Sequence, residues 1–141
     1  MHFIPGKRQR KIAALREHAA IEGLFVEFRT VPGSDKRRAW GLPPIEGNVI
    51  YYGKRLPRRK GRQALRGSLP EKLSWVRSAD GWRAVHQSRS VPDVLSQLAP
   101  EILAASWDEA SCGIYWQERG DTAEVDEIHA ILEQWSKILR E

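Results

Sequence analysis

Hydrophobic and polar residues alternate most regularly between Glu71 and Gln87, in the stretch EKLSWVRSADGWRAVHQ. Strict alternation predicts a strand with one buried face, and the central Asp80-Gly81 pair is typical of a two-residue hairpin turn. Pairing outward from that turn places the following residues opposite each other: Arg77 and Ala84, Val76 and Val85, Trp75 and His86. We therefore expect an antiparallel hairpin with a mainly polar face, Lys72, Ser74, Ser78, Arg83 and Gln87, and a buried face, Leu73, Trp75, Ala79, Trp82 and Ala84.

A helical spacing of apolar residues predicts an element at each end of the chain. Near the C-terminus the pattern follows a capping box, Asp121 to Glu124. Near the N-terminus, apolar positions from Ile12 to Ala19 fit a helix of about four turns that stops at Gly23. The apolar positions of the last helix are Val125, Ile128, Ile131, Leu132, Trp135, Ile138 and Leu139.

Shorter elements are expected between these helices. Within the first expected strand, Val26 and Phe28 should face the core. Strands are predicted over residues 24–31, 38–42, 48–52 and 111–117, and short helices over residues 90–98 and 102–107. The chain therefore predicts one α+β domain over residues 12–141, preceded by a basic leader, residues 1–11. Its antiparallel sheet should have about five short strands, with the first and last helices packed on it.

Composition is sufficient for a packed core without a metal or a disulfide. The chain has 141 residues, of which 41% are apolar, and it contains six Trp. Its only cysteine is Cys112, which excludes an internal disulfide and favours a reducing compartment. The apolar runs of this sequence are too short for a membrane span or a signal peptide.

Charge is distributed unevenly along the chain. Residues 1–66 hold sixteen Lys/Arg against five Asp/Glu, whereas residues 67–141 hold seven against thirteen. Such asymmetry bears on the choice of partners and not on the fold.

The basic residues form two clusters. In the first, the cations lie at a helix start, where the helix dipole disfavours them, so we expect them to serve another purpose than helix stability. In the second, residues 54–66, seven of thirteen residues are basic and none is acidic. The residues expected to bind an anionic partner are Lys7, Arg8, Arg10, Lys11, Lys54, Arg55, Arg58, Arg59, Lys60, Arg62 and Arg66.

Three anionic partners fit these clusters: nucleic acid, an anionic lipid surface, or an acidic protein. The basic segment could equally be a solvated loop, or could pair with the acidic C-terminal helix. Exposed aromatics nearby would favour nucleic acid, because bases stack on them. Tyr51 and Tyr52 are neighbours on a strand, so one of them is expected on an exposed face. Arg77 should instead make a structural contact over the Trp82 ring.

No catalytic motif is present. The four histidines, His2, His18, His86 and His129, have no metal-binding spacing. Cys112 and His86 could form a nucleophile and base, but the apolar run beside Cys112 favours a buried, inert thiol. We therefore expect a non-enzymatic protein without a cofactor.

The two ends of the chain resemble known proteins. The opening FIPGKRQRKIAALREHAAIEGLFVEF resembles the juxtamembrane start of small bacterial inner-membrane proteins, in which a single span precedes a basic cluster and an amphipathic helix. The ending GIYWQERGDTAEVDEIHAILEQW is similar to gammaproteobacterial proteins often catalogued as the YajC preprotein-translocase accessory subunit. The span is not in this sequence, which suggests a truncated chain or a late start codon.

This resemblance implies a cytoplasmic domain held at the inner-membrane face, because Lys7, Arg8, Arg10 and Lys11 would mark the cytoplasmic side of a preceding span. The expected function is that of an accessory or adaptor domain that meets lipid head groups or an acidic partner. The competing hypothesis is a soluble nucleic-acid-binding module that uses residues 54–66.

Overall fold

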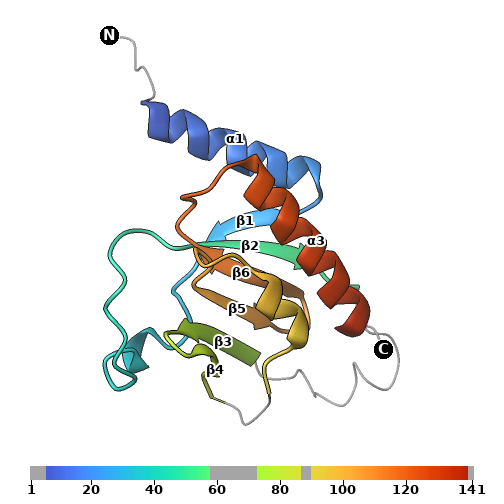
Figure 1. Cartoon of the computed structure of the whole chain (residues 1–141). Coiled ribbons are helices and arrows are strands. Elements are labelled where there is room, and N and C mark those ends of the chain that lie inside the picture. The colour runs from blue at the N-terminus through green and yellow to red at the C-terminus, as the bar shows by residue number, and fades with distance from the viewer. Residues whose placement is uncertain (1–5, 58–72, 87–89, 140–141) are drawn as a thin grey trace.

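The computed structural model of the protein describes residues 6–57, 73–86 and 90–139, and one antiparallel sheet lies at its centre (Figure 1). Six strands of this part of the chain form the sheet in the order β1-β2-β6-β5-β3-β4. Their bounds are Phe25–Phe28 (β1), Ile50–Arg55 (β2), Leu73–Ser78 (β3), Gly81–Ala84 (β4), Ala104–Trp107 (β5) and Ser111–Trp116 (β6). The expected α+β fold is confirmed, with slightly more strands than the sequence predicts.

Helices cover one face of this sheet. They are α1 (Lys7–Ile21), α3 (Thr122–Leu139) and the short 3-10 helix η2 (Asp93–Gln97), as Figure 1 shows. Alternate residues of the central strands point at these helices, because successive side chains of a strand face opposite sides. The larger buried residues on this side are Leu15, Tyr52, Trp75, Leu95, Ile114, Trp116, Ile128, Leu132 and Trp135.

The start of α3 and the end of α1 are set by the residues that the sequence indicates. The Asp121 carboxylate accepts a hydrogen bond of 3.0 Å from the backbone N–H of Ala123, so it caps the start of α3. Gly23 has a φ of 87°, which a side chain would disfavour, and it directs the chain out of α1 into β1. These two predictions are confirmed.

The opposite face of the sheet is covered by the segment between β1 and β2, which contains the 3-10 helix η1 (Ser34–Lys36). Tyr51 and Tyr52, on the two faces of β2, are therefore both 0% exposed. The expectation that one of them is exposed is wrong, because both faces of the sheet are covered. The cluster on this second face comprises Val31, Tyr51, Val76, Val85, Ala104 and Tyr115, with Trp40, Ile45 and Val49 packed against it.

The predicted hairpin is present, but its register differs by two residues. Ser78 pairs with Gly81 and Trp75 with Ala84, so the turn residues are Ala79 and Asp80. A shift of two keeps every side chain on its predicted face, whereas a shift of one would reverse them. Leu73, Trp75, Trp82 and Ala84 accordingly lie on the core side, and the exposed turn residue Ala79 does not. The Arg77 guanidinium lies 4.6 Å from the centre of the Trp82 ring, which confirms the expected contact.

Three local predictions are wrong. The helix expected over residues 102–107 is strand β5, because Ala104–Trp107 lies between β3 and β6 and exchanges hydrogen bonds with both. The strand expected over residues 38–42 is a turn, in which the Trp40 N–H bonds back to Lys36. Phe28 is 66% exposed because β1 is an edge strand, so it is not part of the core.

Candidate functional site

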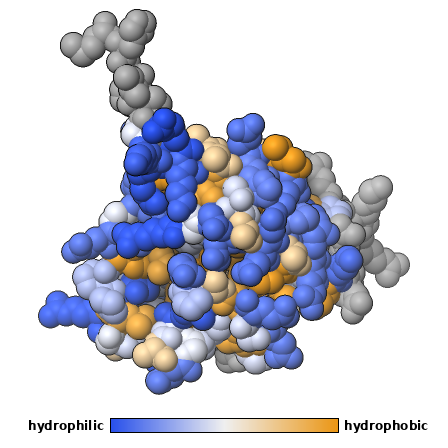
Figure 2. All heavy atoms as spheres, turned by 45° about the horizontal axis from the view of Figure 1, so that its top comes forward, coloured by the Kyte–Doolittle hydropathy of each residue, from blue (hydrophilic) through white to orange (hydrophobic). Residues whose placement is uncertain are grey.

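The first cluster of basic residues is the exposed start of α1. Lys7, Arg8, Arg10 and Lys11 are all exposed, and Figure 2 shows strongly hydrophilic residues gathered where α1 begins. Arg8 donates hydrogen bonds to two backbone carbonyls, at 2.9 Å to Gln117 and 3.1 Å to Glu118. Within the described part of the chain, no ion pair engages the other three residues of this cluster. We call Lys7, Arg8, Arg10 and Lys11 the α1 basic end.

A buried carboxylate holds this helix against the sheet. Glu118, 2% exposed, accepts two hydrogen bonds from the Arg16 guanidinium, at 2.9 and 2.7 Å. The Tyr52 hydroxyl donates a third at 2.6 Å to the same carboxylate. The hydrogen bond to Glu118 raises the pKa of Arg16, and burial, followed by the Glu118 carboxylate, raises the pKa of Tyr52. The α1 basic end is thus carried by a helix that is fixed at its middle.

Glu118 itself has an uncommon backbone conformation, with a φ of 58°. A non-glycine residue rarely adopts this left-handed region. Three side-chain hydrogen bonds and two backbone contacts from Arg8 to Gln117 and Glu118 hold it there. Sequence reasoning missed Glu118, since nothing in the run Gln117 to Gly120 distinguishes a buried acid from an exposed one.

Two residues of the second basic cluster, Lys54 and Arg55, lie at the end of β2. Lys54 donates a hydrogen bond of 2.6 Å to Glu133 of α3, which lowers the pKa of that carboxyl group. The Arg55 guanidinium lies over the Phe25 ring, 4.4 Å from its centre. Lys54 therefore pairs with the acidic C-terminal helix, as one of the sequence alternatives anticipated. Five further members of this predicted cluster lie outside the described residues: Arg58, Arg59, Lys60, Arg62 and Arg66.

The structure does not bring the described parts of the two clusters together. Arg8 bonds to the chain just beyond Trp116, whose strand partner is Ile50 at the start of β2. Arg55 lies at the other end of β2, opposite Ser111. Ile50 and Arg55 are five residue steps apart along β2, which is roughly 17 Å. The α1 basic end is therefore a site separate from Lys54 and Arg55.

A set of histidines and acids joins α1 to α3. His18 Nε2 lies 2.7 Å from an Asp126 oxygen and 3.2 Å from a Glu22 oxygen, and His129 lies 3.7 Å from Glu22. The hydrogen bond to Asp126 raises the pKa of His18, and hydrogen bonds from Glu22 and His18 lower the pKa of Asp126. Burial, more than the neighbouring Asp126 carboxylate, raises the pKa of Glu22. This network is a second set of polar contacts that holds α1 in place, here against α3.

Three residues of this network, His18, Glu22 and Asp126, are of types that bind divalent metals. The ligand atoms of His18, Glu22 and Asp126 all lie within 4.8 Å of one another. His18 and Glu22 are four residues apart on one helix, a spacing visible in the sequence, whereas Asp126 comes from α3. Sequence reasoning therefore missed the set, and its geometry is explained by the ion pairs among its members.

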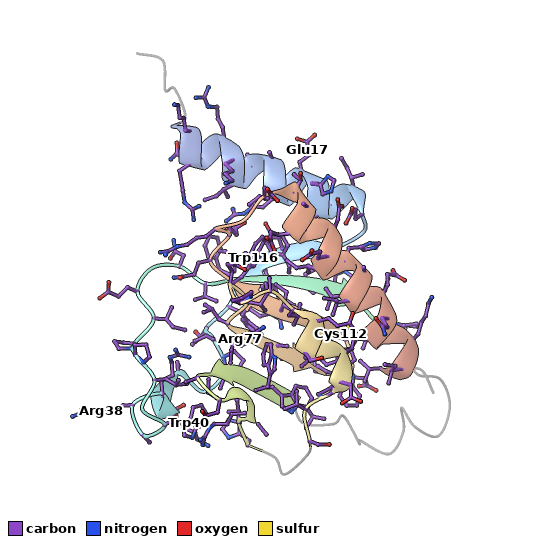
Figure 3. The ribbon with its side chains drawn as sticks, in the orientation of Figure 1. Glu17, Arg38, Trp40, Arg77, Cys112 and Trp116 are labelled. Atoms are coloured by element: carbon purple, nitrogen blue, oxygen red, sulfur yellow. The ribbon has the colours of Figure 1, made fainter. Side chains whose placement is uncertain are left out.

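Cys112 and His86 do not form a nucleophile and base. The Cys112 thiol lies under α3, 4.0 Å from the carbonyl of Leu132, and burial raises its pKa to about 12 (Figure 3). The Nδ1 atom of His86 instead lies 3.0 Å from the Nζ atom of Lys36. Lys36 belongs to η1, in the segment that covers the other face of the sheet. The prediction of a buried, inert thiol is confirmed as far as burial is concerned.

Comparisons with protein-family models, curated proteins and solved structures find no match to this chain. Among the described residues, no helix combines the length and the apolar character needed to cross a membrane.

Proposed function

We propose that this protein is a non-enzymatic accessory or adaptor domain that meets anionic lipid head groups at the cytoplasmic face of the bacterial inner membrane. The observation that carries the proposal is the α1 basic end, where exposed Lys7, Arg10 and Lys11 have no ion-pair partner among the described residues. The resemblance of the two chain ends to inner-membrane proteins points in the same direction.

The energetics of the α1 basic end favour an external anion. Cations in the first turn of a helix oppose its dipole, at a cost of a few tenths of a kcal/mol each. An anionic membrane surface would reverse that balance, because each basic residue close to it gains about 1 kcal/mol. Three cations on one helical turn would therefore supply about 3 kcal/mol, enough for reversible attachment and too little for permanent anchoring.

The rigidity of α1 favours binding of the α1 basic end to an anionic surface. Arg16 is bound to Glu118 and Arg8 to the backbone beyond β6, so α1 is already ordered before any partner arrives. A surface carried on an ordered element loses less conformational entropy on binding than one carried on a flexible tail. The cations of the α1 basic end would thus act together.

The direct test is sedimentation with vesicles of phosphatidylglycerol and phosphatidylcholine, compared with phosphatidylcholine alone. Arg10→Glu with Lys11→Glu should weaken binding to the anionic vesicles by about tenfold or more. The matched control is Arg38→Glu with Lys137→Glu, which changes the net charge equally at exposed positions elsewhere. Figure 3 shows Arg38 extending away from the molecule, far from α1. Equal binding by both double variants would contradict the proposal.

The second basic cluster calls for a separate variant. Replacing Arg58, Arg59, Lys60 and Arg62 by Glu should abolish binding to the same vesicles if segment 54–66 contributes, with thermal stability nearly unchanged. Unaltered binding by this variant and by Arg10→Glu/Lys11→Glu would exclude both charge-based interpretations.

Nucleic acid is the second candidate partner, and one exposed aromatic favours it. Phe28 is 66% exposed at the edge of the sheet, with the Arg16 guanidinium 5.6 Å from the centre of its ring. Bases stack on such rings, typically gaining about 1–3 kcal/mol each. Under this alternative the protein would bind single-stranded RNA with strong salt dependence, Phe28→Ala would weaken that binding, and anionic vesicles would not compete.

A further inference from the structure

A pocket lies between the end of β1 and the segment that covers the second face of the sheet. Its volume is about 540 Å³, within the range of small-molecule sites. Its polar lining residues are Arg29, Thr30, Ser34, Arg37 and Asn48, and its apolar lining includes Val31, Ile45 and Val49. None of the lining residues is acidic. The pocket therefore combines two cations with an apolar wall.

Arg37 is the unusual member of this lining. Its side chain belongs to a residue that is only 8% exposed, and its Nε donates a hydrogen bond of 2.9 Å to the carbonyl of Pro43. Its Nη1 is buried and has no hydrogen-bond partner. Burial alone lowers the pKa of Arg37, and no neighbouring acid raises it. A buried guanidinium without a counter-ion is costly, and buried charges are normally paired.

Arg77 shows how the same protein accommodates another partly buried arginine. The Arg77 guanidinium donates hydrogen bonds to three backbone carbonyls, those of Leu98, Ala99 and Ile102. Its charged plane also lies over Trp82, 4.6 Å from the ring centre. Arg37 is more buried than Arg77 and has one acceptor where Arg77 has three. Its remaining donors are therefore suited to a ligand that supplies acceptors.

Arg29 is the second cation that lines the pocket. Its guanidinium lies over the Tyr51 ring, 3.8 Å from the centre, and pairs with Glu27. These contacts fix a second cation at the pocket while neutralising part of its charge. The uncompensated positive charge of the pocket is thus concentrated at Arg37.

We propose that this pocket binds a small organic anion whose terminal carboxylate or phosphate pairs with the Arg37 guanidinium. Arg has a planar fork of N–H donors that matches both groups in a bidentate manner. The apolar part of the ligand packs against Val31, Ile45 and Val49. This site is separate from the α1 basic end, and it holds a molecule of pocket size where the α1 basic end would meet an extended surface.

The test is isothermal titration calorimetry with phenylphosphate and phenylacetate, and with the neutral phenylethanol as a reference. The native protein should bind at least one of the two anions more tightly than phenylethanol. Arg37→Met, which keeps the apolar bulk, should weaken that binding by about tenfold or more, since a charged hydrogen-bonded pair is lost. Arg38→Met, at the exposed neighbouring position, should leave it unchanged.

Stability without any probe separates binding from a structural role. Arg37→Met should unfold at the same urea concentration as the native protein or a higher one, because it removes a buried unpaired charge. Failure of both anions to bind, equal binding by Arg37→Met, or failure of that variant to fold would each overturn the proposal. Arg10→Glu/Lys11→Glu should retain probe binding, so this site can fail or succeed independently of the membrane proposal.

Discussion

The Arg16 guanidinium and the Glu118 carboxylate form a two-point ion pair, at 2.7 and 2.9 Å, that joins α1 to the chain leaving β6. Its carboxylate is buried and its guanidinium is 36% exposed. The pair therefore holds α1 against the segment that follows β6, while the α1 basic end remains on the surface.

Glu118→Gln should lower the free energy of unfolding by about 2 kcal/mol, because it leaves Arg16 without its counter-ion. The exposure of Arg16 keeps this loss below that of a fully buried pair. The control is Glu17→Gln, which removes the same charge from an exposed position of α1; the Glu17 side chain points away from the sheet in Figure 3. This control should change the free energy of unfolding by less than about 0.5 kcal/mol. Urea unfolding measures both, and equal losses would show that Glu118 is not a fastening residue.

The contact between His18 and Asp126 predicts a pH dependence. The pKa of His18 is raised above 6.5, so its contribution is present below that value and is lost as the pH rises through the higher folded pKa. The pKa of Asp126 is lowered below 3.8, so its contribution is lost as the pH falls through the lower folded pKa. The pair therefore stabilises the protein most between these limits, in mildly acidic solution.

His18→Gln should accordingly destabilise the protein near pH 5.5 and much less near pH 9, compared by urea unfolding. The groups that face His18 from both helices, Glu22, Asp126 and His129, are retained in each protein, together with Glu133 and its partner Lys54. The difference between the two proteins thus reports His18. A difference that grows with pH would contradict the assignment.

The Cys112 thiol should be unreactive in the folded protein. Burial raises its pKa to about 12, so almost no thiolate exists near neutral pH, and the side chain is 0% exposed. Native protein should leave Ellman's reagent unchanged, whereas protein in urea should release one equivalent for its single cysteine. Rapid reaction without denaturant would show that α3 opens readily above β6.

Gly113 has a packing role that a methyl group should disrupt. A Cβ atom there would lie 2.3 Å from Cζ of the Tyr51 ring, which covers the backbone at this point of the sheet. Gly113→Ala should therefore destabilise the protein by about 1–3 kcal/mol. Gly6→Ala, which meets nothing within 4 Å, should cost less, at most about 1 kcal/mol, because it only replaces the N-cap residue of α1 by a less favourable one. Thermal unfolding compares them, and similar melting temperatures would refute the close contact.

The sequence predicts elements well where the local pattern and the tertiary contacts agree. The last helix has a cap at Asp121 and apolar residues at helical spacing over its whole length, and α3 forms where expected. The strand conformation of Ala104–Trp107 is not apparent from its own residues, because it depends on hydrogen bonds to two neighbouring strands: β3, which is distant in sequence, and β6, which follows after a short turn. The sequence predicts the hairpin turn at Asp80-Gly81, whereas the structure has it at Ala79-Asp80. The hydrophobic pattern cannot distinguish the two turns, because both place the same strand side chains in the core.

The candidate sites divide in the same way. The basic clusters are visible in the sequence, because charge density needs no knowledge of the fold. The sequence offers pairing of the second cluster with the acidic C-terminal helix as one alternative, but it does not say which residues pair. The contact of Lys54 with Glu133 depends on α3 crossing the end of β2. Arg37 belongs to the run Lys36-Arg37-Arg38, which has the composition of an exposed surface, yet it is buried between its charged neighbours.

The most direct test of the membrane proposal is a residue-by-residue map of contacts by two-dimensional amide NMR, recorded with and without phosphatidylglycerol-containing nanodiscs. The proposal predicts that signals from Lys7, Arg8, Arg10 and Lys11 weaken first and recover when salt is added, because screening reduces the attraction. Signals from η1 and from the exposed face of α3 should persist. Unchanged signals at the α1 basic end, or attenuation that begins on α3, would contradict it.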